Sequence, residues 1–504
     1  MSRANRFVII LSVLVIGGLA LLVRVRHLGQ TSLDFDEYLH VFAAKSLLAS
    51  GHPALPSGHD YGRALPYTQW VAQSMWWFGT SEAAVRLPSV AAGVALVVLA
   101  GAIACAWWGV GAALLVMVLV ALDPYCLQMS RVCRMYAPFH LLYLAVGYAC
   151  YQGLEGSHGW RRLGWWIGAG IGAMLALRLH PLTADLIAGV AGFIALQAVL
   201  TRRRQYIWLM AAGITGALAA VALGVAHPAK LWHEVNSAPA YAAQWRYDVL
   251  FYLRHWWRID RWIVVLTLPA LAWWIRKHPA RGWYMSCLIL IPFGLHSFIF
   301  DWKEDRYLLQ IVPLMLLVIG SALWGWARSM ADRLARGTAP MADRLVWGIA
   351  AALLAPFLVT FATGRPLSGL DGDVARWREA YTALRPLITP EDQLIISVPL
   401  TSAYYLNRLP DYLTLNALVS DSGHETPRGP DGLHRDWYTG RPLVTDAAEM
   451  QRVFSEHPSG WIVIDRDRFA YETCVPKAVR ELIARRCRRW PSDPSVIVYA
   501  WGKG

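Results

Sequence analysis

The sequence lacks the patterns that mark several common classes of enzyme. Its seven cysteines show no paired or metal-binding spacing. The last 130 or so residues contain no glycine-rich phosphate loop and no nucleophile elbow. No internal repeat is visible, and only 16% of the residues are charged. A disulfide scaffold, a P-loop enzyme and a serine hydrolase are therefore poor interpretations.

Long apolar runs dominate the first 360 residues instead. The chain of 504 residues is 56% hydrophobic, with a mean hydropathy of +0.36, which indicates a polytopic membrane protein. Arg3 and Arg6 precede the first run, and no A-x-A-like cleavage site follows it, so we expect a retained first span. We predict about eleven transmembrane helices, near residues 7–23, 85–106, 110–122, 137–152, 164–177, 182–200, 206–226, 262–275, 283–300, 307–327 and 345–363.

The formal charge of +13 fits membrane topology better than nucleic-acid binding. With the N-terminus in the cytoplasm, nearly all of the positive excess falls on the expected cytoplasmic segments, as the positive-inside rule requires. Most of the 26 tryptophans flank the spans, as interfacial belts do. We therefore expect a multi-pass protein of the cell (inner) membrane, with its C-terminal part in the periplasm or outside the cell, and no nucleic-acid partner.

This topology leaves two long outer loops. The first covers residues 24–84 and contains helical, partly apolar stretches at Asp36–Leu48 and Tyr67–Phe78, which are too short and polar to span the bilayer and are expected at its interface. The second, Ala226–Arg261, is rich in aromatic and basic residues. It suits a headgroup layer or a lipid-chain entrance, or equally an ordinary aromatic belt.

Composition changes after about residue 364. We predict a membrane domain at 1–364 and an extracytoplasmic α/β domain at 365–504. The second domain has a helical stretch at Val374–Leu387 and short apolar runs typical of buried strands at 394–398, 461–464 and 496–500. Cys474 and Cys487 could form a disulfide there, whereas Cys105, Cys150 and Cys287 are expected as small buried apolar residues.

Three carboxylates follow the first span within four residues, at Asp34, Asp36 and Glu37. The expected topology puts other charged groups on the same membrane face, namely Arg131, Arg134 and Tyr136; Arg178 and His180; and Lys303, Glu304, Asp305 and Arg306. This mixture suits transfer from a phosphorylated lipid. Guanidinium groups stabilise the charge on a leaving phosphate, and a carboxylate accepts the proton of an attacking hydroxyl. Such a reaction needs no organic cofactor.

The order of these features resembles the GT-C superfamily of polyprenyl-phosphate-sugar glycosyltransferases, in the branch of protein O-mannosyltransferases and lipid A aminoarabinose transferases. The similar segments are DFDEYLH, RALPYTQW, FGTSEAAVRLPS, ALDPYCLQMSRVCRMY and RYLLQIVPL, which together cover most of residues 1–320. The FGTSEAAVRLPS segment and the acidic pair are the more specific matches, and RYLLQIVPL is weak alone.

The resemblance implies roles for individual residues. Asp36 and Glu37 correspond to the family's acidic pair, with Asp36 favoured as the general base. Donor phosphate binding is expected from Arg131, Arg134, Arg306 and His180, although His180 suits a structural hydrogen bond equally well. Asp34, His40, Arg63 and Tyr136 are candidates for supporting roles. Many relatives have an acidic residue where this chain has Tyr136, so the family's second acid has no counterpart at that position. A divalent metal, with Glu37 or Asp34 as its candidate ligand, is left open.

We therefore expect an integral-membrane glycosyltransferase. It would transfer a sugar from a polyprenyl-phosphate donor to an extracytoplasmic lipid, glycan or protein, with inversion at the anomeric carbon. A lipid-linked oligosaccharide ligase or polymerase is the nearest alternative. A lipid-linked sugar transporter is a weaker one, since it would need ionisable groups near the middle of its spans.

Overall fold

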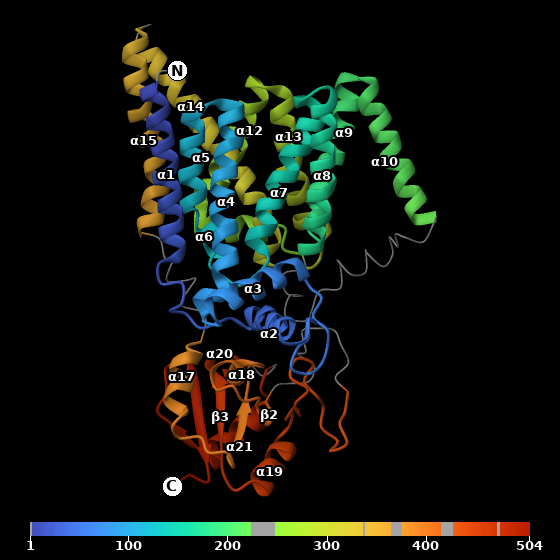
Figure 1. Cartoon of the computed structure of the whole chain (residues 1–504), viewed down its shortest axis with the longest axis vertical. Coiled ribbons are helices and arrows are strands. Elements are labelled where there is room, and N and C mark those ends of the chain that lie inside the picture. Colours follow the sequence, from blue (N-terminus) through green and yellow to red (C-terminus); the bar gives the residue numbers. More distant parts are fainter. Residues whose placement is uncertain are drawn as a thin grey trace. The chain divides into compact units, whose positions relative to one another are not determined.

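The computed structural model describes residues 3–222, 247–335, 338–363, 375–414, 427–470 and 474–503. The chain forms two compact units (Figure 1). The first, the helical unit, comprises residues 1–26, 89–131 and 135–367. The second, the loop–tail unit, comprises residues 27–88, 132–134 and 368–504. The first outer loop thus folds together with the C-terminal α/β region.

Helices build the helical unit, and most of the long ones run side by side in Figure 1, whereas α10 (Arg204–Ala222) extends away from them. Their order follows the predicted runs closely. The helices are α1 (Arg3–Val25), α4 (Glu82–Trp108), α5 (Val110–Leu122), α6 (Pro124–Met129), α7 (Tyr136–Tyr151), α8 (Gly159–Leu179), α9 (Thr183–Thr201), α10 (Arg204–Ala222), α12 (Phe251–Lys277), α13 (Pro279–Gly294), α14 (Val312–Leu334) and α15 (Ala339–Thr363). Helix α4 begins in the loop–tail unit and crosses into the helical unit after Pro88.

Five helices among the described residues are long and apolar enough to span a membrane. They are Glu82–Trp108, Thr183–Thr201, Pro279–Ile299, Asp305–Leu334 and Ala339–Ala362. The membrane character of the chain is therefore supported, whereas the count of eleven spans is not confirmed. Helices such as α5, with 13 residues, and α7, with 16, fall short of the ~20 residues that cross a bilayer core.

The second predicted outer loop differs from the expectation. Its first part lies outside the described residues, but its last part is helical, since α12 begins at Phe251. Asp260 interrupts this helix with φ −140° and ψ 84°. The predicted boundary near residue 262 therefore marks a kink inside a helix. The apolar pattern changes at the same place, which is why the sequence suggested a span start.

The first outer loop contains two helices, as predicted. Helix α2 (Phe35–Ser50) begins after Asp34 and ends at Gly51, whose φ of +75° is readily adopted only by glycine. Helix α3 (Leu65–Phe78) starts with a proline in its first turn and ends before Gly79. Their inner faces are lined by buried Tyr38, Val41, Tyr67 and Val71. Their expected position at a membrane interface remains a prediction.

A five-stranded mixed sheet forms the C-terminal part of the loop–tail unit, in the order β2-β1-β3-β5-β4. The strands are β1 (Gln393–Ile396), β2 (Tyr412–Leu413), β3 (Gly460–Asp465), β4 (Arg488–Trp490) and β5 (Val496–Trp501). Strand β1 runs parallel to β2 and β3, whereas β5 is antiparallel to β3 and β4. The three predicted strands all lie in this sheet.

Alternate residues of the central strands supply two separate cores. Leu394, Ile396 and Val463 pack with helix α17 (Trp377–Leu384) on one face. Ile395 and Ile462 pack on the other face with helices α19 (Ala447–Glu456) and α21 (Lys477–Arg486). Successive side chains of a strand point to opposite faces of the sheet, so strands that are covered on both faces bury both sets of side chains, as these do. Cys474 and Cys487 are free thiols in the structure, and so is Cys105, which is exposed, while Cys150 and Cys287 are buried.

Candidate active site

Glu37 is the centre of a buried polar network in the loop–tail unit. Its Oε1 accepts hydrogen bonds from Arg86 Nε at 2.8 Å and from the Cys133 backbone N–H at 2.5 Å. Its Oε2 accepts from Arg86 Nη2 at 2.8 Å and from the Asp34 backbone N–H at 2.9 Å. The last bond completes a capping box at the start of α2. Four donors therefore hold this carboxylate, which ties three segments of the chain together.

Arg86 extends the same network. Beyond its two-pronged pair with Glu37, its guanidinium donates to the carbonyl oxygens of Leu28, Thr31 and Ser32 at 2.8–3.1 Å. A planar guanidinium with five fixed donors suits this task, and a lysine could not replace it. The pair is buried on both sides. Glu37 and Arg86 thus fix the segment that leads into α2, and we interpret both residues as structural.

Asp36 lies one residue earlier and has a different environment. Its Oδ2 is 3.0 Å from Arg134 Nη2, and Arg134 Nη1 donates to the Asp36 backbone carbonyl at 3.2 Å. The Asp36 side chain is 25% exposed, compared with 2% for Glu37. Arg134 itself is buried. Asp36 therefore presents an accessible carboxylate held by the Arg134 guanidinium. The carboxylate of the next residue, Glu37, is buried and fully hydrogen-bonded.

His40 lies one turn further along α2. Its Nδ1 is 2.9 Å from Thr68 Oγ1, and the rings of Tyr61 and Tyr67 meet its ring edge-on. Burial, together with the positive charge of Arg134, holds the pKa of His40 well below its usual range. The imidazole is therefore neutral near pH 7. Arg63 and Asp34 are both exposed, and Arg63 lies close enough to His40 to act on it electrostatically.

The C-terminal region supports the segments that carry these residues. The Leu33 backbone N–H donates to the Tyr405 hydroxyl at 3.2 Å, and the Tyr404 hydroxyl donates to the Thr80 carbonyl at 2.5 Å. Arg378 Nε donates to Glu82 at 2.9 Å and Arg378 Nη2 donates to the Gly29 carbonyl at 2.6 Å. The sequence showed no signal for this association.

Arg131 belongs to the helical unit and has a different setting from Arg134. Its Nη1 donates to the carbonyl oxygens of Val23, Arg24 and Arg26 at 2.7–3.1 Å, which satisfies the free carbonyls at the end of α1. These contacts favour a structural role for Arg131. Arg131 and Arg134, only three residues apart in the SRVCRMY segment, therefore belong to different units.

Tyr136 and His180 lie together in the helical unit, with ring centroids 5.5 Å apart. His180 ends α8, and its Nδ1 accepts the backbone N–H of Leu182 at 3.2 Å. The sequence left two roles open for His180, a contact with the donor phosphate or a structural hydrogen bond, and the structure contains such a hydrogen bond. Arg306 pairs with Glu304 at 2.5 Å and keeps a third of its side chain exposed.

The helical unit contains a second polar cluster, of which the sequence pattern singles out only Lys303. Asp185 Oδ2 lies 3.0 Å from His296 Nε2 and accepts from Gln310 Nε2 at 2.8 Å. Nearby, Lys303 donates to three backbone carbonyls, including that of His296 at 3.1 Å. Asp185 lies more than 100 residues before His296 and Gln310, so no local motif could indicate this contact. All four residues are buried.

The suggestion that Glu37 binds a metal does not fit its contacts. A carboxylate has about four lone-pair positions, and four N–H groups already occupy those of Glu37. No group of three or more metal-ligating side chains was found within the described ranges. Glu37 is therefore a poor metal ligand in this arrangement.

The chain shares its fold with solved structures of two proteins, ArnT and AglB, as the resemblance seen in the sequence led us to expect. Two solved structures of ArnT from Cupriavidus metallidurans, one in the apo state and one bound to undecaprenyl phosphate, share 16% and 17% identity with it. Their TM-scores are 0.62 and 0.60, and each comparison covers 99% of this chain and 98% of ArnT.

A second solved protein is similar over less of its own length. The oligosaccharyltransferase AglB from Archaeoglobus fulgidus, in complex with an inhibitory peptide and a dolichol-phosphate, has 12% identity and a TM-score of 0.60. The match covers 99% of this chain and 74% of AglB. No family model and no curated protein matches the sequence. At these identities the comparisons establish the fold.

Proposed function

We propose that this protein is an integral-membrane glycosyltransferase that transfers a single sugar from a polyprenyl-phosphate donor to an extracytoplasmic acceptor. The observation that carries the proposal is the Asp36–Arg134 pair, an accessible carboxylate fixed on a buried guanidinium at 3.0 Å. The shared fold supports it, since the solved relatives include ArnT with undecaprenyl phosphate and AglB with dolichol-phosphate.

Asp36 is the general base in this proposal. The acceptor hydroxyl attacks the anomeric carbon while the bond from that carbon to the phosphate oxygen breaks. The phosphate leaves with the electron pair, and Asp36 takes the hydroxyl proton. Direct displacement inverts the anomeric carbon. Arg134 holds Asp36 in place and supplies positive charge for the leaving phosphate. Arg306 and His180 remain predicted contacts of the donor phosphate.

A matched set of variants tests the assignment of the base. Asp36→Asn should lower turnover by about 10²–10⁴-fold, because a neutral amide cannot accept the proton, while the melting temperature stays near that of the wild type. Glu37→Gln should instead lower the free energy of unfolding by roughly 3–5 kcal/mol, since it leaves the buried Arg86 charge uncompensated. Asp34→Asn, at an exposed neighbouring acid, is the control.

The measurement is release of undecaprenyl phosphate from undecaprenyl-phosphate hexoses and pentoses by full-length protein in nanodiscs, with cell-envelope lipids, glycans and proteins as acceptors. Binding of undecaprenyl phosphate itself is titrated in parallel. Wild-type turnover in Asp36→Asn would overturn the assignment of the base. Undiminished undecaprenyl phosphate binding in both Arg134→Ala and Arg306→Ala would remove those residues from the donor site.

Transfer of a preassembled oligosaccharide is the second candidate. The likeness to AglB supports it, but the near-complete mutual coverage with ArnT favours transfer of one sugar. Mass spectrometry of the modified acceptor distinguishes the two, because the mass added is that of one sugar or of a block.

A further inference from the structure

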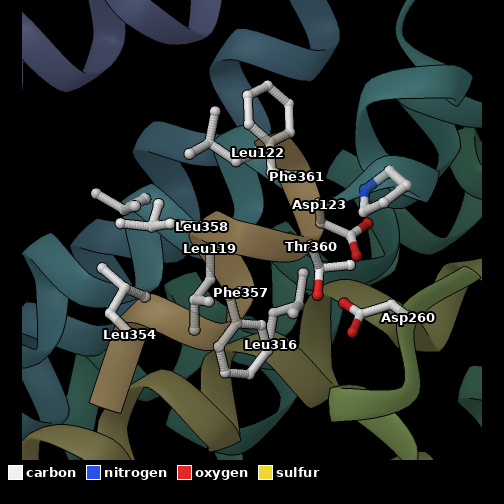
Figure 2. Close-up of a pocket in the computed structure, with 12 residues that line it drawn as sticks. Leu119, Leu122, Asp123, Asp260, Leu316, Leu354, Phe357, Leu358, Thr360 and Phe361 are labelled. Atoms are coloured by element: carbon white, nitrogen blue, oxygen red, sulfur yellow. The ribbon is translucent and has the colours of Figure 1, made fainter. Parts of the chain in front are cut away.

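A small cavity in the helical unit brings two buried carboxylates together. Figure 2 shows Asp123 and Asp260 pointing into it beside Thr360, with leucine and phenylalanine side chains of α5, α14 and α15 around them. Asp123 follows α5, and Asp260 lies at the interruption of α12. The cavity volume is about 20 Å³. One water-sized group needs about 10–15 Å³ on this measure, so there is room for a single small ligand.

The oxygen atoms that face this cavity are incompletely satisfied. Asp123 is 4% exposed and Asp260 is 3% exposed. Asp123 Oδ1 accepts the Cys126 backbone N–H at 2.7 Å, but Asp123 Oδ2 is buried and has no hydrogen-bond partner among the described residues. Asp260 Oδ1 accepts the Trp262 backbone N–H at 3.0 Å. Thr360 Oγ1 donates its proton to the Pro356 carbonyl at 2.9 Å and accepts a hydrogen bond from Trp262 Nε1 at 3.0 Å, which leaves one lone pair of this oxygen for the cavity.

The local charges leave a negative excess. Arg24, the nearby base, acts on Asp123 electrostatically, but its guanidinium donates to Ser130 Oγ and to the carbonyls of Ala20 and Ala121 at 3.0–3.1 Å. One positive charge thus faces two carboxylates. A buried charge without compensation is costly, so the pair requires one further positive charge, either a bound cation or a shared proton.

We infer that this cavity binds one monovalent metal cation of the size of Na⁺. The available ligands are carboxylate and hydroxyl oxygens, which hard cations prefer. The interruption of α12 at Asp260 supports this choice, because unwound helices inside membrane proteins coordinate Na⁺ and H⁺. Such an ion would join α5, α12 and α15, and its role would be to stabilise the helical unit. The inference does not depend on the proposed glycosyl transfer.

Binding of ²²Na⁺ to the full-length protein in detergent at pH 8 tests the inference directly. We expect saturable binding of one ion per chain, displaced by unlabelled Na⁺. We also expect the melting temperature to rise with Na⁺ when N-methylglucamine chloride keeps the ionic strength constant. Asp260→Asn and Asp123→Asn should each weaken Na⁺ binding at least tenfold. Asp332→Asn, which changes an exposed acid of α14, should leave it unchanged.

Thr360→Val provides a milder variant of nearly the same volume, in case the aspartate variants do not fold. It should weaken Na⁺ binding severalfold without abolishing it. No saturable ²²Na⁺ binding in the wild type would overturn the inference. In that case, stabilisation by acidification from pH 8 to pH 6 without Na⁺ would identify a shared proton, and stabilisation by Ca²⁺ or Mg²⁺ alone would identify a divalent ion.

Discussion

Adjacent residues of α2 carry different tasks because their side chains leave the helix in different directions. Glu37 points inward to Arg86, whereas Asp36 stays accessible beside Arg134. The sequence predicted that this acidic pair is important and favoured Asp36 as the base. It could not show that Glu37 is fully occupied, because Arg86 and Cys133 lie 49 and 96 residues away from it. Local spacing indicates a residue's type and neighbours, but not its distant partners.

His40 gives a prediction at the same scale. Its pKa is lowered in the folded protein, so below the usual histidine pKa of about 6.5 the unfolded chain binds a proton that the folded chain does not. The stability from His40 is therefore complete above about pH 6.5 and falls on acidification, by up to ~1.4 kcal/mol per pH unit. Urea unfolding between pH 7.5 and 5 measures this slope. His40→Gln should reduce it, whereas His59→Gln, at an exposed site, should not.

Helices of the helical unit meet at positions where only glycine fits. A Cβ atom on Gly93 of α4 would lie 2.4 Å from Ser130 Cβ and 2.9 Å from Arg24 Nε. The close approach lets Arg24 reach Ser130 Oγ at 3.0 Å. The apolar runs predicted these helices within a few residues. They did not predict the interruption at Asp260, since the backbone of α12 departs there from helical geometry without a proline or glycine.

Gly93→Ala tests this packing. The added methyl group must displace Ser130 or Arg24, so we expect a loss of about 1–3 kcal/mol in the free energy of unfolding. Gly168→Ala in α8 is the matched control, because no neighbouring atom lies within 4 Å of its added Cβ. Thermal unfolding in one detergent compares them. Equal melting temperatures for the two variants would contradict the close contact.

At the scale of the whole molecule, composition predicted a membrane part and an α/β part. The association of the first outer loop with the C-terminal region was not predicted, because it depends on pairs separated by about 300 residues, such as Glu82 and Arg378. Glu82 and Arg86 both lie in FGTSEAAVRLPS, the segment that carried much of the family resemblance. In the structure these two residues join segments of the loop–tail unit.

Arg378→Ala should therefore loosen the first outer loop from the tail. The substitution removes the ion pair with Glu82 and the hydrogen bond to the Gly29 carbonyl. Hydrogen bonds to charged groups contribute about 1.5–3 kcal/mol each to stability. We expect faster proteolysis within residues 27–88 and a roughly tenfold lower turnover. Arg376→Ala, at an exposed position close by, is the control. Equal proteolysis rates in the two variants would count against this support.

The association of loop and tail has a consequence during synthesis. Residues 27–88 emerge first, whereas Tyr404 and Tyr405, which contact them, are made more than 300 residues later. At about 5–20 residues per second, the ribosome needs roughly 20–80 s to complete the chain beyond residue 88. For most of that interval, until Tyr404 and Tyr405 have been made, the segment bearing Asp36 lacks these contacts. Nascent chains should consequently pass through a period in which residues 27–88 are more sensitive to proteases, and this period cannot end before Tyr404 and Tyr405 have been made.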